Sequence, residues 1–196
     1  MTLNEATLLI LFLFPLAYSP GPGNMFFAAL GARYGLKASM PANLGYHLAT
    51  FIASFAIGAG FTVVFNAQSI VFGILQKAGA VYIFWLAYKI YRSQTGPELV
   101  NAKPAGPFAG AILLLLNPKG YLIMALMFSQ FQATTLGQTA VIAGIFTINN
   151  MVAFLVWTMA GQSLAQLFQS AKAARYLNTG FAICLAIVAL WLMLAP

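Results

Sequence analysis

Two short motifs interrupt long apolar stretches of this sequence, and they hold most of the residues that could contact a solute. The first motif is Pro20-Gly21-Pro22-Gly23-Asn24 and the second is Asn117-Pro118-Lys119. Proline removes a backbone donor and clashes with the preceding turn, and glycine is a poor helix former, so each motif should break a helix. A helix N-terminus exposes N–H groups with partial positive charge, which suit a carboxylate. The amides of Asn24 and Asn117 would add hydrogen bonds, and Lys119 would add an ammonium group.

Four more polar residues lie inside apolar stretches and form a second group of candidate contacts: Asn43, His47, Asn149 and Asn150. Asn43 and His47 are one helical turn apart, so they share a helix face. The two adjacent asparagines lie near the middle of a later apolar stretch. We expect their amides either to form hydrogen bonds between helices or to contact a solute. His47 is the only histidine, and histidine is the side chain that most readily exchanges protons near neutral pH.

Other kinds of chemistry have few residues to work with. The only acidic residues are Glu5 and Glu98, and the only cysteine is Cys184. A lone cysteine cannot form an internal disulfide, a redox pair or a cysteine-based metal cluster, and hard divalent cations need several oxygen ligands. Because there is no acidic pair, phosphate loop or nucleophile–base set, we predict no enzymatic activity, no metal site and no cofactor. Any proton that crosses the apolar stretches would therefore have to be handled by His47, Lys119 or a bound solute.

The composition predicts the elements that position these residues. Hydrophobic residues make up 62% of the 196, charged residues only 6%, and the mean hydropathy is +0.88, whereas about a quarter of a soluble domain is charged. This composition predicts an all-α polytopic membrane protein in a lipid bilayer. Because no Lys or Arg precedes it, the first apolar stretch is interpreted as a retained span and not as a signal peptide. Hydropathy predicts six spans, the first and fourth long enough to contain a break: 6–32, 43–65, 70–91, 108–133, 138–161 and 177–195.

Most positively charged residues sort to one side of the predicted spans. They fall between spans one and two, three and four, and five and six: Arg33, Lys37, Lys89, Arg92, Lys103, Lys172 and Arg175. The opposite loops, 66–69 and 132–138, carry no charge. By the positive-inside rule, the charged loops are cytoplasmic and both termini are periplasmic. Membrane orientation therefore explains the net charge of +7 better than binding to nucleic acid does.

The spans divide into two halves, 1–92 and 108–196, joined by a hydrophilic cytoplasmic linker at 93–107. Three spans per half is an odd number, so the halves must have opposite orientations. We therefore predict a single transmembrane transporter domain over 1–196, built as a 3+3 inverted repeat of six transmembrane helices with broken first and fourth helices. Gly31 and Gly35 have GxxxG spacing, which suits either a homo-oligomer interface or packing within one chain.

Three motifs in order resemble the LysE/RhtB-type family of amino-acid exporters. Residues 20–24 match the family's Pro-Gly-Pro-x-Asn motif, and residues 117–119 match its Asn-Pro-Lys motif. Between them, residues 79–87 are similar to the family's Gly-Ala-x-Tyr-Leu-x-x-Leu-Gly segment, with Ala87 in place of the usual final glycine. The length and the six-span layout are also similar, so the resemblance covers essentially the whole chain.

The resemblance implies a multi-pass protein of the bacterial inner membrane that exports amino acids or their derivatives, driven by the proton motive force. The shared motifs do not specify the substrate. Because no carboxylate lies within the predicted spans, a cationic amino acid is disfavoured and a small neutral one is favoured. The alternatives are a non-transporting membrane scaffold and an exporter of another small solute or an ion.

Overall fold

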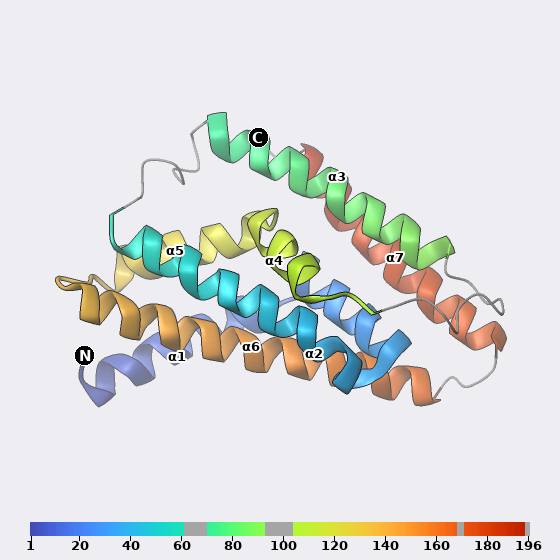
Figure 1. Cartoon of the computed structure of the whole chain (residues 1–196), viewed down its shortest axis with the longest axis horizontal. Coiled ribbons are helices and arrows are strands. Elements are labelled where there is room, and N and C mark those ends of the chain that lie inside the picture. Colours follow the sequence, from blue (N-terminus) through green and yellow to red (C-terminus); the bar gives the residue numbers. More distant parts are fainter. Residues whose placement is uncertain (61–69, 93–103, 168–170, 195–196) are drawn as a thin grey trace.

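The protein folds into seven α-helices within the residues that the computed structural model describes, which are 1–60, 70–92, 104–167 and 171–194. None of these described residues forms a strand. The helices lie side by side in an elongated bundle (Figure 1). They are α1 (Leu3–Tyr18), α2 (Pro22–Gly58), α3 (Ile70–Arg92), α4 (Pro107–Leu115), α5 (Pro118–Gln130), α6 (Leu136–Leu167) and α7 (Ala171–Leu194). The predicted all-α class is therefore confirmed.

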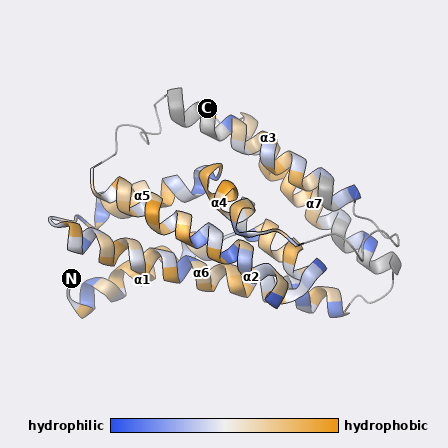
Figure 2. Ribbon diagram, viewed as in Figure 1, coloured by the Kyte–Doolittle hydropathy of each residue, from blue (hydrophilic) through white to orange (hydrophobic). Residues whose placement is uncertain are grey.

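Hydrophobic residues recur along all seven helices (Figure 2). Many large apolar side chains are exposed, among them Leu8, Leu11, Leu44, Leu48, Ile52 and Ile148. Such a surface is costly in water but is well solvated by lipid tails. By length and hydropathy, α6 qualifies as a membrane span alone, and the α1–α2 and α4–α5 pairs each qualify as one bent span. The described helices thus fit a membrane protein, while the complete 3+3 arrangement of six spans stays a prediction.

Both predicted helix breaks are present. α1 ends at Tyr18, and Pro22 then occupies the first position of α2, where its missing N–H would have had no helical partner. α4 ends at Leu115, and Pro118 begins α5 in the same way. The α1–α2 pair bends by 65° and the α4–α5 pair by 64°.

α2 differs from the prediction because it continues through 33–42, where a connection between the first two spans was expected. Only Gly35 leaves the helical conformation, with φ 78° and ψ 172°, in the left-handed region that glycine adopts without steric cost. The Leu36 N–H donates to Gln162 Oε1 at 2.6 Å, and Ser39 Oγ donates to the Gly35 carbonyl at 2.8 Å. A single glycine corner therefore replaces the expected loop.

Two other predicted segments fall partly outside the described residues. Residues 61–69 include the end of the second predicted span and the uncharged loop after it. Residues 93–103 include most of the predicted linker; the described part, 104–106, leads directly into Pro107 at the start of α4.

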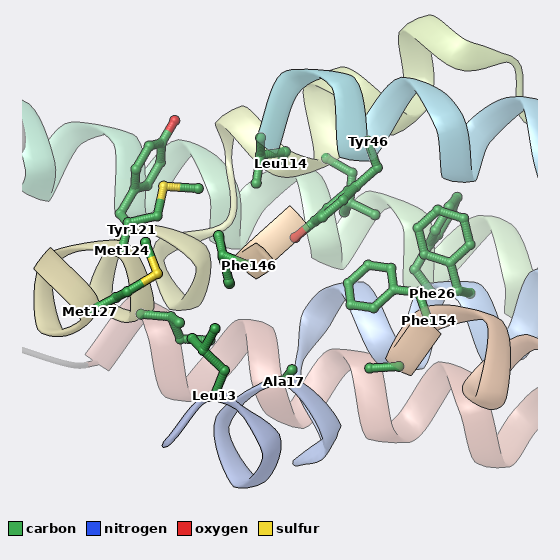
Figure 3. Close-up of a cluster of buried hydrophobic side chains, with 14 of the residues drawn as sticks. Leu13, Ala17, Phe26, Tyr46, Leu114, Tyr121, Met124, Met127, Phe146 and Phe154 are labelled. Carbon is green, nitrogen blue, oxygen red and sulfur yellow. The ribbon is translucent and has the colours of Figure 1, made fainter. Parts of the chain in front are cut away.

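The bundle is organised around α2, which packs against α6 and α4, while α3 pairs with α7. Glycines allow α2 and α6 to touch, since a Cβ on Gly31 would collide with the backbone of Thr158, and one on Gly161 with the backbone of Ala28. Gly31 therefore serves packing within the chain, one of the two roles expected of the GxxxG spacing. The main buried core surrounds both helix breaks (Figure 3).

Candidate functional site

The two helix breaks meet at the side chain of Lys119. This residue lies in the first turn of α5 and reaches the end of α1, where its Nζ donates to the Ser19 carbonyl at 2.6 Å and to Ser19 Oγ at 3.0 Å. The aliphatic part of the lysine lies against Gly21, because a Cβ at that position would be 2.7 Å from Lys119 Cδ. An ammonium group has three N–H donors, so these two bonds leave one donor for a ligand.

Breaking a helix in an apolar core leaves carbonyl groups of its last turn without partners, and each needs a new donor. Two donors come from the break itself. Ser19 Oγ donates to the Leu16 carbonyl at 3.0 Å, and Asn24 Nδ2 donates to the Ala17 carbonyl at 2.9 Å. The Asn24 amide predicted to bind a solute thus also stabilises the end of α1.

Two further donors come from distant helices. Trp157 Nε1, on α6, donates to the Tyr18 carbonyl at 3.1 Å, and the bond from Lys119 to Ser19 completes the set. The end of α1 is therefore held by side chains that are 100 and 139 positions away in the sequence.

The second break is bound to α2 through Asn117, which directly precedes α5 and makes no side-chain capping hydrogen bond to it. Its Nδ2 donates to the Tyr46 hydroxyl at 2.7 Å. Its Oδ1 is buried and has no hydrogen-bond partner in the described part of the chain. This unpartnered acceptor is available to a donor from a ligand.

His47 links α2 to α6 through both ring nitrogens. Its Nδ1 donates to the Asn43 carbonyl at 2.8 Å, and its Nε2 accepts from Asn150 Nδ2 at 3.2 Å. A carbonyl only accepts and an amide nitrogen only donates, so these partners place the ring proton on Nδ1 of a neutral imidazole. The side-chain amide of Asn43 is buried, and neither its nitrogen nor its oxygen has a partner among the described residues. Asn149 is half-buried, and its Nδ2 is likewise unpartnered there.

A small cavity lies between the two breaks, which we call the central cavity. Its lining includes Asn24, Tyr46, Asn117, Lys119 and Asn150. Its volume is about 10 Å³, which holds about one water molecule. The structure thus brings four predicted site residues around one space, yet in this conformation the space is too small for an amino acid.

The remaining predicted residues of the two motifs are neighbours in sequence of residues that line the central cavity, but they are not part of its lining. Pro20 is exposed, whereas Gly21, Pro22, Gly23 and Pro118 are buried. Gly23 permits a close contact, because a Cβ there would be 2.6 Å from the ring of a phenylalanine on α6. The side chains of these five residues offer no polar group to a solute.

A family model described as LysE type translocator matches residues 14–195. The chain belongs to the LysE type translocator family. Members of this family are transporters and not enzymes, and they are bacterial membrane proteins. The resemblance carried by the three motifs, at residues 20–24, 79–87 and 117–119, is thereby confirmed at the level of the family.

Relatives of this LysE type translocator are efflux proteins. A homoserine/homoserine lactone efflux protein of Salmonella typhimurium is 26% identical over 85% of this chain and 84% of its own length. A leucine efflux protein of Enterobacter sp. is 26% identical over 82% of this chain and 76% of its own length. A cysteine/O-acetylserine efflux protein of Escherichia coli is 28% identical over 86% of this chain and 87% of its own length. No solved structure matches the chain significantly.

Four side chains at the centre of this translocator were not predicted from the sequence: Ser19, Tyr46, Phe154 and Trp157. Ser19 could have been included, because it directly precedes the first motif and ends α1. Tyr46 lies on α2 beside His47, where its aromatic character alone indicates packing. The aromatic residues of α6 gave no signal, since their role depends on which helix they meet.

Proposed function

We propose that this LysE type translocator is a secondary transporter of the bacterial inner membrane that exports amino acids or their derivatives. Small neutral amino acids are its preferred substrates, and the proton motive force drives it. The observation that carries the proposal is the meeting of two half-helix N-termini and one ammonium group, with no carboxylate among the described residues nearby. The efflux names of its relatives support export as the direction of transport.

The electrostatics of the central cavity favour an α-carboxylate. Asn24 lies in the first turn of α2, Asn117 directly precedes the first turn of α5, and both line the cavity. The partial positive charges of two helix N-termini therefore add to the full charge of Lys119. Glu5, the acidic residue within the described ranges, lies in the first turn of α1, about 20 Å along the helix axis from Ser19.

The same inventory favours a neutral side chain on the substrate. The α-ammonium of an amino acid needs acceptors, and the unpartnered Oδ1 of Asn117, which lines the cavity, is suitable. A second positive charge, as on lysine, would need a carboxylate partner at membrane depth. The described residues around the cavity provide none.

The described helices support the proposed inverted repeat. Both breaks are followed by a helix that starts with proline, and the bends are 65° and 64°. If one half is superimposed on the other, α1 is equivalent to α4, and the later part of α2 is equivalent to α6. The contact of α2 with α4 then corresponds to that of α1 with α6, and both contacts occur. This symmetry would place the proposed substrate site at the junction of the halves.

His47 is the proposed proton carrier. Its neutral ring accepts a hydrogen bond from Asn150 through Nε2, so protonation of Nε2 would abolish that bond between α2 and α6. A proton could therefore change how the two helices contact each other. This role gives the transporter a proton-sensitive group although its spans lack carboxylates.

Efflux from preloaded cells tests the proposed function. Radiolabelled L-leucine, L-homoserine and O-acetyl-L-serine would be loaded, and efflux compared between cells with the protein and cells with an empty vector. We expect faster efflux of at least one of these, slower efflux after a protonophore, and no acceleration for L-lysine. Equal efflux from both strains for all solutes, with the protein present in the membrane, would show that the proposal is wrong.

A further inference from the structure

A larger cavity lies between α2, α3 and the segment that leads into α4. We call it the Arg33 vestibule, after the charged residue in its lining; Tyr34, Tyr82, Trp85 and Ala109 also line it. Its volume is about 230 Å³, compared with about 10 Å³ for the central cavity. An amino acid that cannot fit between the breaks therefore has room in the vestibule.

Arg33 is half-buried beside this space. Its guanidinium carbon lies 4.9 Å from the centre of the Tyr34 ring, a distance typical of a cation–π contact. Among the described residues, no carboxylate pairs with it. A planar guanidinium with unused N–H donors can bind a carboxylate through two parallel hydrogen bonds.

The opposite wall is aromatic. Tyr82 and Trp85 are neighbours on one face of α3, with ring centres 5.6 Å apart and an angle of 29° between the ring planes. Small residues, including Ala29 and Ala109, leave the space in front of these rings open. An apolar side chain would remove aromatic and methyl surface from water here, and an ammonium group could lie over a ring face.

An aromatic layer separates the vestibule from the central cavity. Phe26 lines the vestibule and contacts Phe27, with ring centres 5.3 Å apart. Phe27 in turn lies 5.0 Å from Phe154 and 6.0 Å from Tyr46, and both of these line the central cavity. Figure 3 shows Phe26, Tyr46 and Phe154 grouped on one side of Leu114 and Phe146. A solute in the vestibule is thus one aromatic layer away from Lys119.

We propose that the Arg33 vestibule is an access site for zwitterionic amino acids with an apolar or small uncharged side chain. Arg33 binds the α-carboxylate, and the Tyr82–Trp85 wall takes the side chain before the substrate passes to the central cavity. This inference rests on the proposed function. It adds a second carboxylate site, on the side of the membrane that the positive-inside rule predicts to be cytoplasmic.

Transport into inverted membrane vesicles tests the site, because their exposed face is the cytoplasmic one. The half-saturating concentrations of L-leucine, L-homoserine and O-acetyl-L-serine would be compared for the wild type, Arg33→Gln and Lys37→Gln. Lys37 is the matched control, since it is exposed on the same helix and its change removes the same charge. For Arg33→Gln we expect the half-saturating concentration to rise about tenfold and the maximal rate to stay within about twofold of the wild type. For Lys37→Gln we expect neither quantity to change. Equal effects of the two changes would overturn the inference and leave Arg33 with an anchoring role at lipid headgroups.

A second variant tests the space without altering charge. Ala109→Leu would fill part of the vestibule, so half-saturation should rise more for L-leucine than for L-alanine. An equal rise for both amino acids, or no rise, would contradict the assigned side-chain site. This result would test the vestibule even if Arg33→Gln failed to insert into the membrane.

Direct binding distinguishes failure of this inference from failure of the proposed function. Radiolabelled L-leucine would be titrated onto the wild type and Arg33→Gln in lipid nanodiscs, with 3-methylbutylamine, which lacks the carboxylate, as a competitor. Arginine-dependent binding that the amine does not displace, without any transport, would support the site and refute the transport function. Transport with unchanged half-saturation in Arg33→Gln would support the function and refute the site.

Discussion

The replacement of Lys119 by methionine is the sharpest test of the central site. Lys119→Met removes the ammonium but keeps a flexible apolar chain of similar length. The Ser19 carbonyl loses a charge-assisted hydrogen bond of 2.6 Å, and an unsatisfied buried acceptor costs about 1–3 kcal/mol. The substitution also removes the free-energy cost of partly burying a charged ammonium group, and this offsets part of that loss. We therefore expect unfolding stability to fall by no more than about 2 kcal/mol.

Substrate recognition should suffer more than stability. A charge-assisted hydrogen bond to the substrate carboxylate contributes about 1.5–3 kcal/mol, which corresponds to roughly 10- to 100-fold in half-saturation. The informative measurement is the ratio of half-saturation for L-leucine to that for L-leucinol, which lacks the carboxylate. If Lys119 binds the carboxylate, the preference for leucine should shrink in Lys119→Met by about this factor.

The ratio separates recognition from a purely structural role. A lysine that only caps the Ser19 carbonyl would affect both solutes equally, so the variant would keep the wild-type preference. That outcome, with correctly inserted protein, would exclude binding of the substrate carboxylate by Lys119. Lys77→Met is the matched control, because Lys77 is exposed on α3 and the chemical change is identical. Thermal unfolding in detergent, followed for all three proteins, reports the change in stability.

Three further changes test the packing and the polar links around the site. Gly161→Ala should lower the midpoint of thermal unfolding, because a Cβ there would collide with the backbone of α2. A Cβ on Gly144 would meet nothing within 4 Å, so Gly144→Ala should leave the midpoint unchanged or raise it. Equal shifts in the two variants would contradict the close packing of α2 against α6 at Gly161. Trp157→Phe should cost about 1–3 kcal/mol of stability, measured by denaturant unfolding, because the Tyr18 carbonyl loses its donor; an unchanged free energy of unfolding would show that another group replaces it. His47→Gln should retain exchange of labelled for unlabelled substrate in proteoliposomes and lose accumulation driven by a proton gradient; intact accumulation would exclude His47 as the proton carrier.

The helix breaks could be predicted from the sequence because proline and glycine act locally. Pro22 and Pro118 lack the N–H that a continuing helix needs, whatever surrounds them, and each does begin a helix. The continuation of α2 through 33–42 could not be predicted in this way. It depends on the left-handed conformation of Gly35 and on a side chain from α6, Gln162, that bonds the freed N–H.

The partners at the centre depend on tertiary packing. A lysine within an apolar span needs a partner or water, and its place in the sequence does not say which partner it finds. The structure identifies a backbone partner, the Ser19 carbonyl. Which of the asparagines would bond Tyr46 or His47 was equally undetermined, since those pairs are 71 and 103 positions apart. Sequence reasoning therefore finds residues that need partners, and the fold decides which partners they obtain.

Three of the cavities follow one another along the first broken span, as the proposed transport path requires. Along the first broken span, Glu5 lines a cavity of about 320 Å³ at the start of α1, the central cavity adjoins the break, and Arg33 lines the vestibule near the corner of α2. Leu13, Met124 and Met127 pack on one side of the break, and the aromatic layer packs on the other (Figure 3). A solute could leave the centre only if one of these layers rearranged. Methionine side chains are flexible and repack easily, whereas the aromatic rings are held by specific edge-to-face contacts, so we expect the two layers to open by different motions.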